Sequence, residues 1–192
     1  MCGRYYIEID DRELQDICDA VQRKQHDGGG YEQLEIKMSG EIFPTDIVPV
    51  QTNIGQYQAM KWGFAGFDGR PVINARSETA FVKPLFRDSM RDRRCLIPAS
   101  GYYEWLKEGA RKTKYRFYTP QKPIYLAGCF REEKGVPYQS FVILTREASG
   151  GAEKIHSRMP LIISQSGMSL WFEKGAYTGA PPPEALLIAA SP

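Results

Sequence analysis

The stretch that decides the fold class is CLIPASGYYEWL, residues 95–106. It contains two short apolar runs, 95–97 and 102–106, with turn-forming residues between them. Further apolar runs follow at 124–130, 141–145 and 160–163, again separated by turn residues. Short runs of β-branched and aromatic residues divided by turns are typical of an antiparallel sheet or barrel. We therefore expect a barrel-like antiparallel β core.

Helical patterns flank this β-rich region. Residues 4–9 predict a strand, and the helical spacing that follows predicts an amphipathic helix over residues 11–26, with Asp10 as its N-cap. Residues 76–92 also look helical, but Pro84 should break that helix. The sequence thus predicts an α+β fold with an antiparallel barrel-like core and flanking helices.

Composition limits the class of protein. A chain of 192 residues with 42% apolar and 25% charged residues fits one globular domain, spanning 1–192. It has no apolar stretch near the ~18 residues of a membrane span and no signal-peptide pattern, so we expect a cytoplasmic protein. The four cysteines form no CxxC pair, and we expect no metal and no cofactor. A net charge of +2 means that any DNA surface must be a local basic cluster.

Cys2 directly follows the initiator methionine, which is normally removed before a small second residue. Removal exposes an α-amine and a thiol on one residue, with unperturbed pKa values of about 7.7–8.0 and about 8.5. The amine can form a Schiff base with an aldehyde. The thiol can then close a thiazolidine ring, at an effective molarity of about 10⁵ M or more. The alternative is that Cys2 is merely a small terminal residue.

Two further side chains suit proton transfer. His156 lies between apolar residues at a strand entry, and histidine titrates near neutral pH. The alternative for His156 is a core or capping role. Strand alternation puts Tyr102 and Glu104 on one face, and Tyr103 and Trp105 on the other. A carboxylate held among aromatics suits general acid/base catalysis, whereas the alternative is a solvent-facing glutamate.

Other segments suit a nucleic-acid partner. In an extended segment Asn74 and Arg76 point the same way, so they can orient a sugar and bind a phosphate. The alternative is a polar strand end that makes turn contacts. Trp62 and Phe64 flank a glycine and can stack on bases, although such residues are usually core. The basic run at 83–94 is a phosphate surface or simply a solvated face.

In this order, the segments resemble the SOS-response-associated peptidase family, the abasic-site DNA–protein crosslinkers. The matches span residues 1 to about 172, and the ordered set is specific where each match alone is not. The matching stretches are Met1–Tyr5, Trp62–Phe64, Ile73–Thr79, Arg94–Trp105, Ala127–Gly128, Ile143–Thr145 and Ile155–Pro160.

The resemblance implies a role for each matched residue. Cys2 is implied as the thiazolidine-forming nucleophile, and Asn74 as the residue that positions the opened sugar and the Cys2 amine. Glu104 is implied as the acid/base for Schiff-base formation and ring closure, and His156 as the group that helps to open the deoxyribose. The implied DNA ligands are the arginines Arg4, Arg76 and Arg158, the polar neighbour Thr145, and a wedge formed by Pro44, Trp62 and Phe64.

The resemblance also implies a β-rich domain with a positively charged groove that binds single-stranded DNA containing abasic sites. We expect a monomer without cofactor or metal that is nucleoid-associated when bound to DNA. We also expect self-processing of Met1 and lyase activity. One departure from the family is the short segment 64–73, with a turn at Asp68-Gly69.

Two other functions remain open. Cys2, His156 and Glu104 also suit acyl transfer by an N-terminal-nucleophile thiol peptidase or amidase. A non-catalytic single-strand binder would show only salt-reversible binding to DNA.

Overall fold

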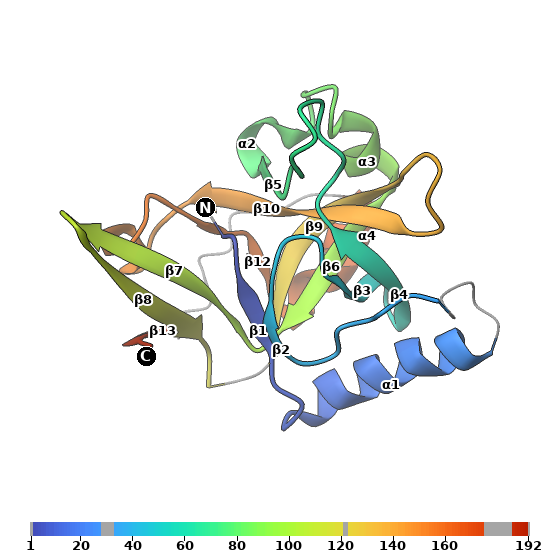
Figure 1. Cartoon of the computed structure of the whole chain (residues 1–192), viewed down its shortest axis with the longest axis horizontal. Helices are drawn as coiled ribbons and strands as arrows, with labels where there is room; N and C mark the ends of the chain where they lie inside the picture. The colour runs from blue at the N-terminus through green and yellow to red at the C-terminus, as the bar shows by residue number, and fades with distance from the viewer. Residues whose placement is uncertain (1, 28–32, 121–122, 175–185, 192) are drawn as a thin grey trace.

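Five strands of the computed structural model close into a barrel at the centre of the molecule (Figure 1). The structure describes residues 2–27, 33–120, 123–174 and 186–191. The barrel strands are β3 (Ile47–Asn53), β4 (Gln56–Trp62), β6 (Arg94–Ala99), β9 (Ile124–Glu132) and β10 (Gln139–Glu147). They pair in the order β10, β4, β3, β6, β9 and back to β10. The predicted α+β fold with a barrel-like core is confirmed.

Strand β10 pairs with four other strands and so connects most of the larger sheet. It pairs antiparallel with β9 and with β11 (Arg158–Pro160), and β12 (Ile162–Ile163) adds to β9. It pairs parallel with β4 and with β5 (Asn74–Arg76). These two parallel pairs depart from a purely antiparallel core. Because a tight turn cannot join parallel strands, long crossover connections lead from β4 and β5 to β10.

Both sides of the barrel wall are buried, which explains the near-continuous apolar runs in the sequence. In β6, Cys95 and Ile97 belong to the interior cluster, whereas Leu96 belongs to the outer cluster beneath the helices. Gly128 lets β9 and β10 approach closely, since a Cβ there would lie 2.6 Å from the carbonyl oxygen of Val142.

The helices cover the outside of the barrel. The predicted helix is confirmed as α1 (Arg12–His26), which packs on β3 and β4. Its N-cap is Asp11, whose carboxylate accepts a hydrogen bond from the backbone of Leu14 at 3.0 Å, so the prediction of Asp10 was wrong by one residue. Pro84 does interrupt the next helical region. The remaining helices are α2 (Ser77–Ala80), α3 (Arg87–Asp92) and α4 (Met168–Lys174).

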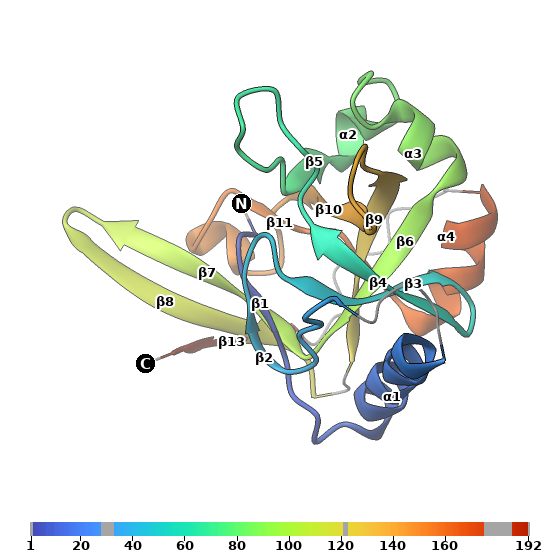
Figure 2. The ribbon, with the colours of Figure 1, turned by 45° about the vertical axis from the view of Figure 1, so that its right-hand side comes forward.

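A five-stranded sheet leans against the barrel and carries the N-terminal segment. Its strands are β13 (Leu187–Ala190), β8 (Arg111–Tyr118), β7 (Gly101–Glu108), β1 (Tyr5–Ile7) and β2 (Gly40–Ile42), in this spatial order. The β7–β8 hairpin projects well beyond the barrel (Figure 2). The pairing of β1 with β7 sets Tyr5 opposite Tyr102 and so fixes the start of the chain.

No helix in the described part of the chain is long and apolar enough to cross a membrane.

Candidate active site

Cys2 is fully buried just ahead of β1, among the apolar side chains of the barrel interior. Its thiol donates to the carbonyl oxygen of Arg4 over 3.9 Å. Burial raises the pKa of the Cys2 thiol well above its usual value, and the negative charge of Glu104 raises it further. The thiol is therefore protonated at neutral pH and needs a base before it can attack.

Asn74 fixes the backbone of Cys2. It lies in β5, and its pairing with β10 places it opposite Ile143. Its Nδ2 donates a hydrogen bond of 2.9 Å to the carbonyl oxygen of Cys2. Its Oδ1 is buried and accepts no hydrogen bond from the described residues. Because buried polar atoms are normally paired, this oxygen is an acceptor that a substrate or the N-terminal amine can satisfy.

Glu104 lies on the inward face of β7 and is only 4% exposed. The aromatic neighbours predicted from strand alternation are present, since Tyr102 is buried on the same face and stacks on Phe117 at 4.6 Å. The charge of Glu104 acts on both the Cys2 thiol and the Tyr102 phenol, and burial with this charge raises the pKa of Tyr102. Glu104 is therefore a carboxylate within electrostatic reach of Cys2 in a dry environment.

Two buried phenols complete this region, and the sequence had not singled them out. The hydroxyls of Tyr5 and Tyr102 are buried and have no hydrogen-bond partner among the described residues. The two tyrosines are cross-strand partners, so their side chains are on the same face of the sheet, and both lie within electrostatic reach of the Cys2 thiol. The alternation that places Tyr102 beside Glu104 was the available signal for this residue.

His156 lies between the short 3₁₀ helix Ala152–Lys154 and β11. Its Nδ1 accepts a hydrogen bond of 3.0 Å from the backbone of Arg158. Nδ1 also lies 3.2 Å from the carbonyl oxygen of Arg158, so the backbone of Arg158 orients the ring whichever nitrogen carries the proton. Strand pairing places Asn74, Arg76 and Arg158 along the same half of β10.

Arg158 is already occupied by a carboxylate. Its guanidinium makes a fork to Glu78 with bonds of 2.7 and 2.8 Å, and it donates to the carbonyl oxygen of Thr145 at 2.6 Å. The hydrogen bonds from Arg158 to the Glu78 carboxylate lower the pKa of Glu78 to about 2. Thr145 is fully buried, and its hydroxyl donates to the carbonyl oxygen of Ala75 over 3.4 Å. A phosphate at Arg158 must displace Glu78 or share the guanidinium with it.

Arg4 is likewise paired before any DNA binds. It donates to Glu41 at 3.1 Å and lies over the rings of Phe43 and Trp105, at 4.0 and 5.1 Å. Arg76 is exposed and forms no ion pair with the described residues. Of the three predicted phosphate ligands, Arg76 is the one open to a ligand. Sequence reasoning missed Glu41 and Glu78, because each comes from a distant segment.

The predicted aromatic wedge needs a correction. Trp62 and Phe64 are both fully buried, and Trp62 donates its indole N–H to the carbonyl oxygen of Ile73 at 3.0 Å. Core packing therefore prevents either ring from stacking on a base. Pro44 is half-buried. The exposed aromatics of this region are Phe43, at 39%, and Phe67, which is fully exposed.

The short segment between β4 and β5 forms the expected turn. The backbone of Gly69 donates to Gly66 at 3.3 Å, and Phe64 pairs with Val72. Phe67 is at the tip of this turn, which explains its exposure. Within the described ranges, no group of three histidine, cysteine or acidic residues is arranged to hold a metal ion.

A family model described as SOS response associated peptidase (SRAP) matches residues 1–190. The chain belongs to this family. The SRAP chain is 32% identical over 187 residues to the abasic site processing protein YoaM of Bacillus subtilis, a match that covers 89% of this chain and 78% of that protein. It is 35% identical over 118 residues to the abasic site processing protein YedK of Escherichia coli, covering 59% of this chain and 53% of that one. The latter match thus spans about half of the E. coli relative.

Solved structures share the fold of this SRAP chain. A protein from Bacteroides thetaiotaomicron superposes with a TM-score of 0.78 at 21% identity, over 98% of this chain and 91% of that one. A protein from Bordetella bronchiseptica superposes with a TM-score of 0.75 at 19% identity, over the full length of both chains. At these identities the likeness supports the fold alone.

Proposed function

We propose that this SRAP protein uses Cys2, after removal of Met1, to form a covalent crosslink with the aldehyde of an abasic site in single-stranded DNA. The placement of Cys2 is the observation that carries the proposal. Asn74 donates a hydrogen bond to the carbonyl oxygen of Cys2, and the negative charge of Glu104 raises the pKa of the Cys2 thiol. The names of the E. coli and B. subtilis relatives support abasic-site DNA as the substrate.

The first step is opening of the deoxyribose ring. An abasic sugar exists as a closed hemiacetal, and only its open form presents the aldehyde. His156, whose ring is oriented by the backbone of Arg158 at Nδ1, donates a proton to the ring oxygen. Glu104 accepts the proton of the anomeric hydroxyl. The buried oxygen of Asn74 then holds the Cys2 amine for attack.

The second step joins protein and DNA. The α-amine of Cys2 adds to the aldehyde carbon, and Glu104 returns its proton to the carbinolamine hydroxyl, which leaves as water and gives a protonated Schiff base. The sulfur then attacks the imine carbon, the thiol proton passes to Glu104, and the imine electron pair returns to nitrogen. Because burial keeps the thiol protonated, this base is required for ring closure. The thiazolidine resists the β-elimination that an open Schiff base undergoes, so the strand stays intact.

Binding uses the groups around the site. Arg76 takes a phosphate directly, and Arg4 and Arg158 take phosphates by exchanging or sharing their carboxylate partners. Thr145 orients Arg158 rather than touching DNA, because it is fully buried. Phe43 and Phe67 replace Trp62 and Phe64 as the rings that stack on the strand, since both are exposed.

The same site removes its own Met1 in this proposal, in keeping with the family description as a peptidase. Glu104 accepts the thiol proton as the Cys2 sulfur attacks the Met1 carbonyl, and the Met1–Cys2 amide bond breaks with its nitrogen leaving as the Cys2 α-amine. Water then hydrolyses the resulting thioester and releases Met1. Intact-mass measurement of wild type and Glu104→Ala from one host tests this step. Met1 is expected to stay on the variant and to be absent from wild type. Equal processing of the two proteins would contradict it.

The crosslink is tested with a uracil-containing single strand treated with a uracil glycosylase. Wild type is expected to give an adduct that survives a denaturing gel, and Cys2→Ala none. Cys18→Ala is the matched control, because Cys18 is a buried thiol on α1 that donates to the carbonyl oxygen of Met38. Equal adduct from wild type and Cys2→Ala would refute the proposal.

A further inference from the structure

The five-stranded sheet has two chemically different faces. One face packs on the barrel through side chains such as Tyr102 and Phe117. The opposite face, which we call the outer face, holds the side chains that alternate with these. Cross-strand pairing sets Tyr103 opposite Arg116 and Trp105 opposite Lys114 on this face. Its residues are Arg4, Tyr6, Glu8, Glu41, Tyr103, Trp105, Lys107, Lys112, Lys114, Arg116 and Tyr118.

Cations and rings alternate along the outer face. Lys112 lies 5.0 Å from the centre of the Trp105 ring, and Lys114 lies 4.0 Å from that of Tyr103. Arg116 is over both Tyr6 and Tyr118, at 4.5 and 5.1 Å. Tyr6 and Tyr103 are buried beneath these cations, whereas Trp105 and Tyr118 are half-buried. Cations beside accessible aromatic rings on a sheet are the arrangement that proteins use for single-stranded nucleic acid.

The charge of the outer face is strongly positive. It carries five cations and the two carboxylates Glu8 and Glu41, an excess of three positive charges, while the whole chain has a net charge of only +2. Lys107 and Lys112 form no ion pair with the described residues. The outer face alone therefore carries a larger net positive charge than the whole chain.

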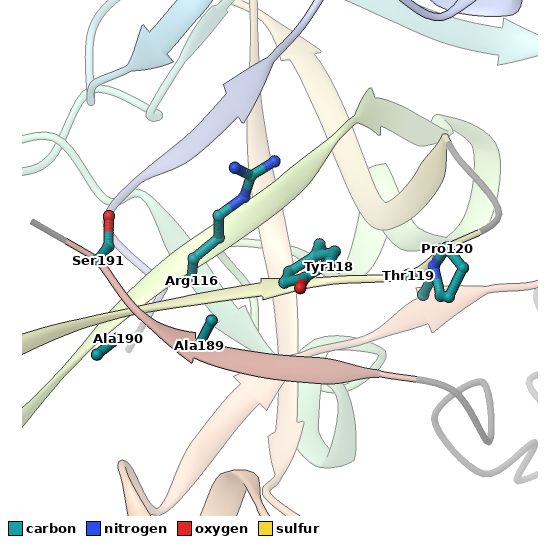
Figure 3. Close-up of a pocket in the computed structure, with 7 residues that line it drawn as sticks. All are labelled: Arg116, Tyr118, Thr119, Pro120, Ala189, Ala190 and Ser191. Atoms are coloured by element: carbon teal, nitrogen blue, oxygen red, sulfur yellow. The ribbon is translucent and has the colours of Figure 1, made fainter.

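A pocket lies at the end of the outer face that is formed by Arg116 and Tyr118. A pocket of about 370 Å³ is lined by Arg116, Tyr118 and the small residues of β13 (Figure 3). Ala189 is opposite Arg116 in the pairing of β13 with β8, so this side of the pocket is lined by a small side chain. This volume is at the lower end of the range of small-molecule sites, which suits a single nucleobase with its phosphate.

The outer face is continuous with the site at Cys2. Arg4 is two residues from Cys2, and its guanidinium lies over Trp105. From there the outer face extends in two directions, outward along the projecting hairpin to Lys107 and Lys112, and back along β8 to Tyr118 (Figure 2). The face from Lys112 to Tyr118 is about 20 Å long at ~3.3 Å per residue, which is several nucleotides of single strand.

We propose that the outer face binds the single-stranded DNA on one side of the abasic site, along β8 from Lys112 near the hairpin end, past Arg4, to the pocket at Arg116 and Tyr118. Lys107, Lys112 and Lys114 neutralise phosphates of this flank, and Tyr118 stacks on a base. The inference rests on the proposed function for its substrate. Its test uses undamaged DNA, so it does not depend on any covalent step.

The test is fluorescence anisotropy with an undamaged, labelled single strand of about 20 nucleotides at several salt concentrations. The triple variant Lys107→Gln/Lys112→Gln/Lys114→Gln is expected to bind at least tenfold more weakly at low salt. Its plot of log affinity against log salt should be shallower by about 2, since each phosphate contact contributes about 0.7. Tyr118→Ala is expected to weaken binding about tenfold with the salt slope unchanged.

The matched control removes three exposed cations from α1, as Arg12→Gln/Arg23→Gln/Lys24→Gln. It should bind like wild type. Thermal unfolding verifies that each variant is folded, and the single change Lys112→Gln, at an exposed position, serves if the triple variant is not. Binding of the outer-face variant within twofold of wild type would overturn the proposal. So would an equal loss in the α1 control.

Discussion

The two faces of β7 carry opposite environments within one strand. Tyr102 and Glu104 point inward to a dry region where burial keeps the Cys2 thiol protonated. Tyr103 and Trp105 point outward beneath the cations of β8. Proton transfer needs the dry inner environment, and binding of a polyanion such as DNA needs the cationic outer face. Because side chains alternate between the two faces, one strand can serve the reaction rate with one face and DNA affinity with the other. The first two predictions below test that separation, and the later ones test the stability of the inner face and of the Glu78 ion pair.

The substitution Glu104→Gln should give the largest effect of all the variants. It should change the rate of crosslinking and leave the affinity for DNA unchanged. Loss of the acid/base is expected to slow crosslinking by about 10²–10⁴, while affinity for undamaged single strand stays within twofold. Single-turnover rates at saturating abasic DNA measure the first quantity, and anisotropy measures the second. Glu108→Gln is the control, since it is exposed at the hairpin end of the same strand. A rate within threefold of wild type would remove Glu104 from the mechanism.

The substitution Trp105→Leu, on the outer face, should lower the affinity for DNA and leave the rate of crosslinking unchanged. Loss of the ring that lies beneath Arg4 and Lys112 is expected to weaken binding of single-stranded DNA about tenfold. At saturating DNA the crosslinking rate should remain near that of wild type. If the saturated rate falls as far as in Glu104→Gln, the two faces are not separate.

Tyr102→Phe sharpens the description of the inner face. It keeps the ring stacked on Phe117 and removes a buried hydroxyl without a described partner. The free energy of unfolding should stay the same or rise by about 1 kcal/mol, because an unpaired buried hydroxyl is costly.

Tyr125→Phe is the control for Tyr102→Phe, since the Tyr125 hydroxyl donates to Glu13. That change should lower the free energy of unfolding by about 1 kcal/mol. Chemical denaturation measures both variants. A clear loss of stability in Tyr102→Phe would mean that its hydroxyl is paired in the folded protein.

The smallest effect is expected at Glu78, beside the inner region. Its pKa of about 2 in the folded protein lies below the ordinary value of 4.5. Its ion pair therefore stabilises the fold above about pH 4.5 and is lost as the pH falls towards 2. The side chain is 48% exposed, so the effect is screened and should stay under about 1 kcal/mol.

Glu78→Gln tests this dependence. Denaturation of wild type and variant at pH 7 and pH 3 is the measurement. The wild type should lose more stability than Glu78→Gln over this interval. An equal loss in both proteins would mean that the pair with Arg158 contributes nothing to folding.

Patterns of local sequence predicted much of the fold. The spacing of apolar runs predicted the barrel, helical periodicity predicted α1, and Pro84 predicted the break between α2 and α3. β8 was missed because its outer face consists of cations, which mask the apolar alternation of its inner face. Parallel pairing of β10 could not be predicted, since it depends on contacts between distant segments.

The candidate site divides in the same way. The alternation of side chains along β7 predicted that Tyr102 is on the same face as Glu104, because alternation is a property of a single strand. The burial of Trp62 and Phe64 could not be predicted, because it depends on which elements cover them. The partners Glu41 and Glu78 come from segments 37 and 80 residues away from the arginines that they bind.

The most direct test of the central claim compares wild type with Cys2→Ser on abasic single-stranded DNA, with and without borohydride. Wild type should give an adduct without reduction, with the mass of the protein lacking Met1 plus the DNA minus one water. Cys2→Ser should need borohydride to give a stable adduct and should cleave more strand otherwise, because it can form only the Schiff base. An unreduced, denaturant-stable adduct of Cys2→Ser would contradict joint action of the amine and the thiol.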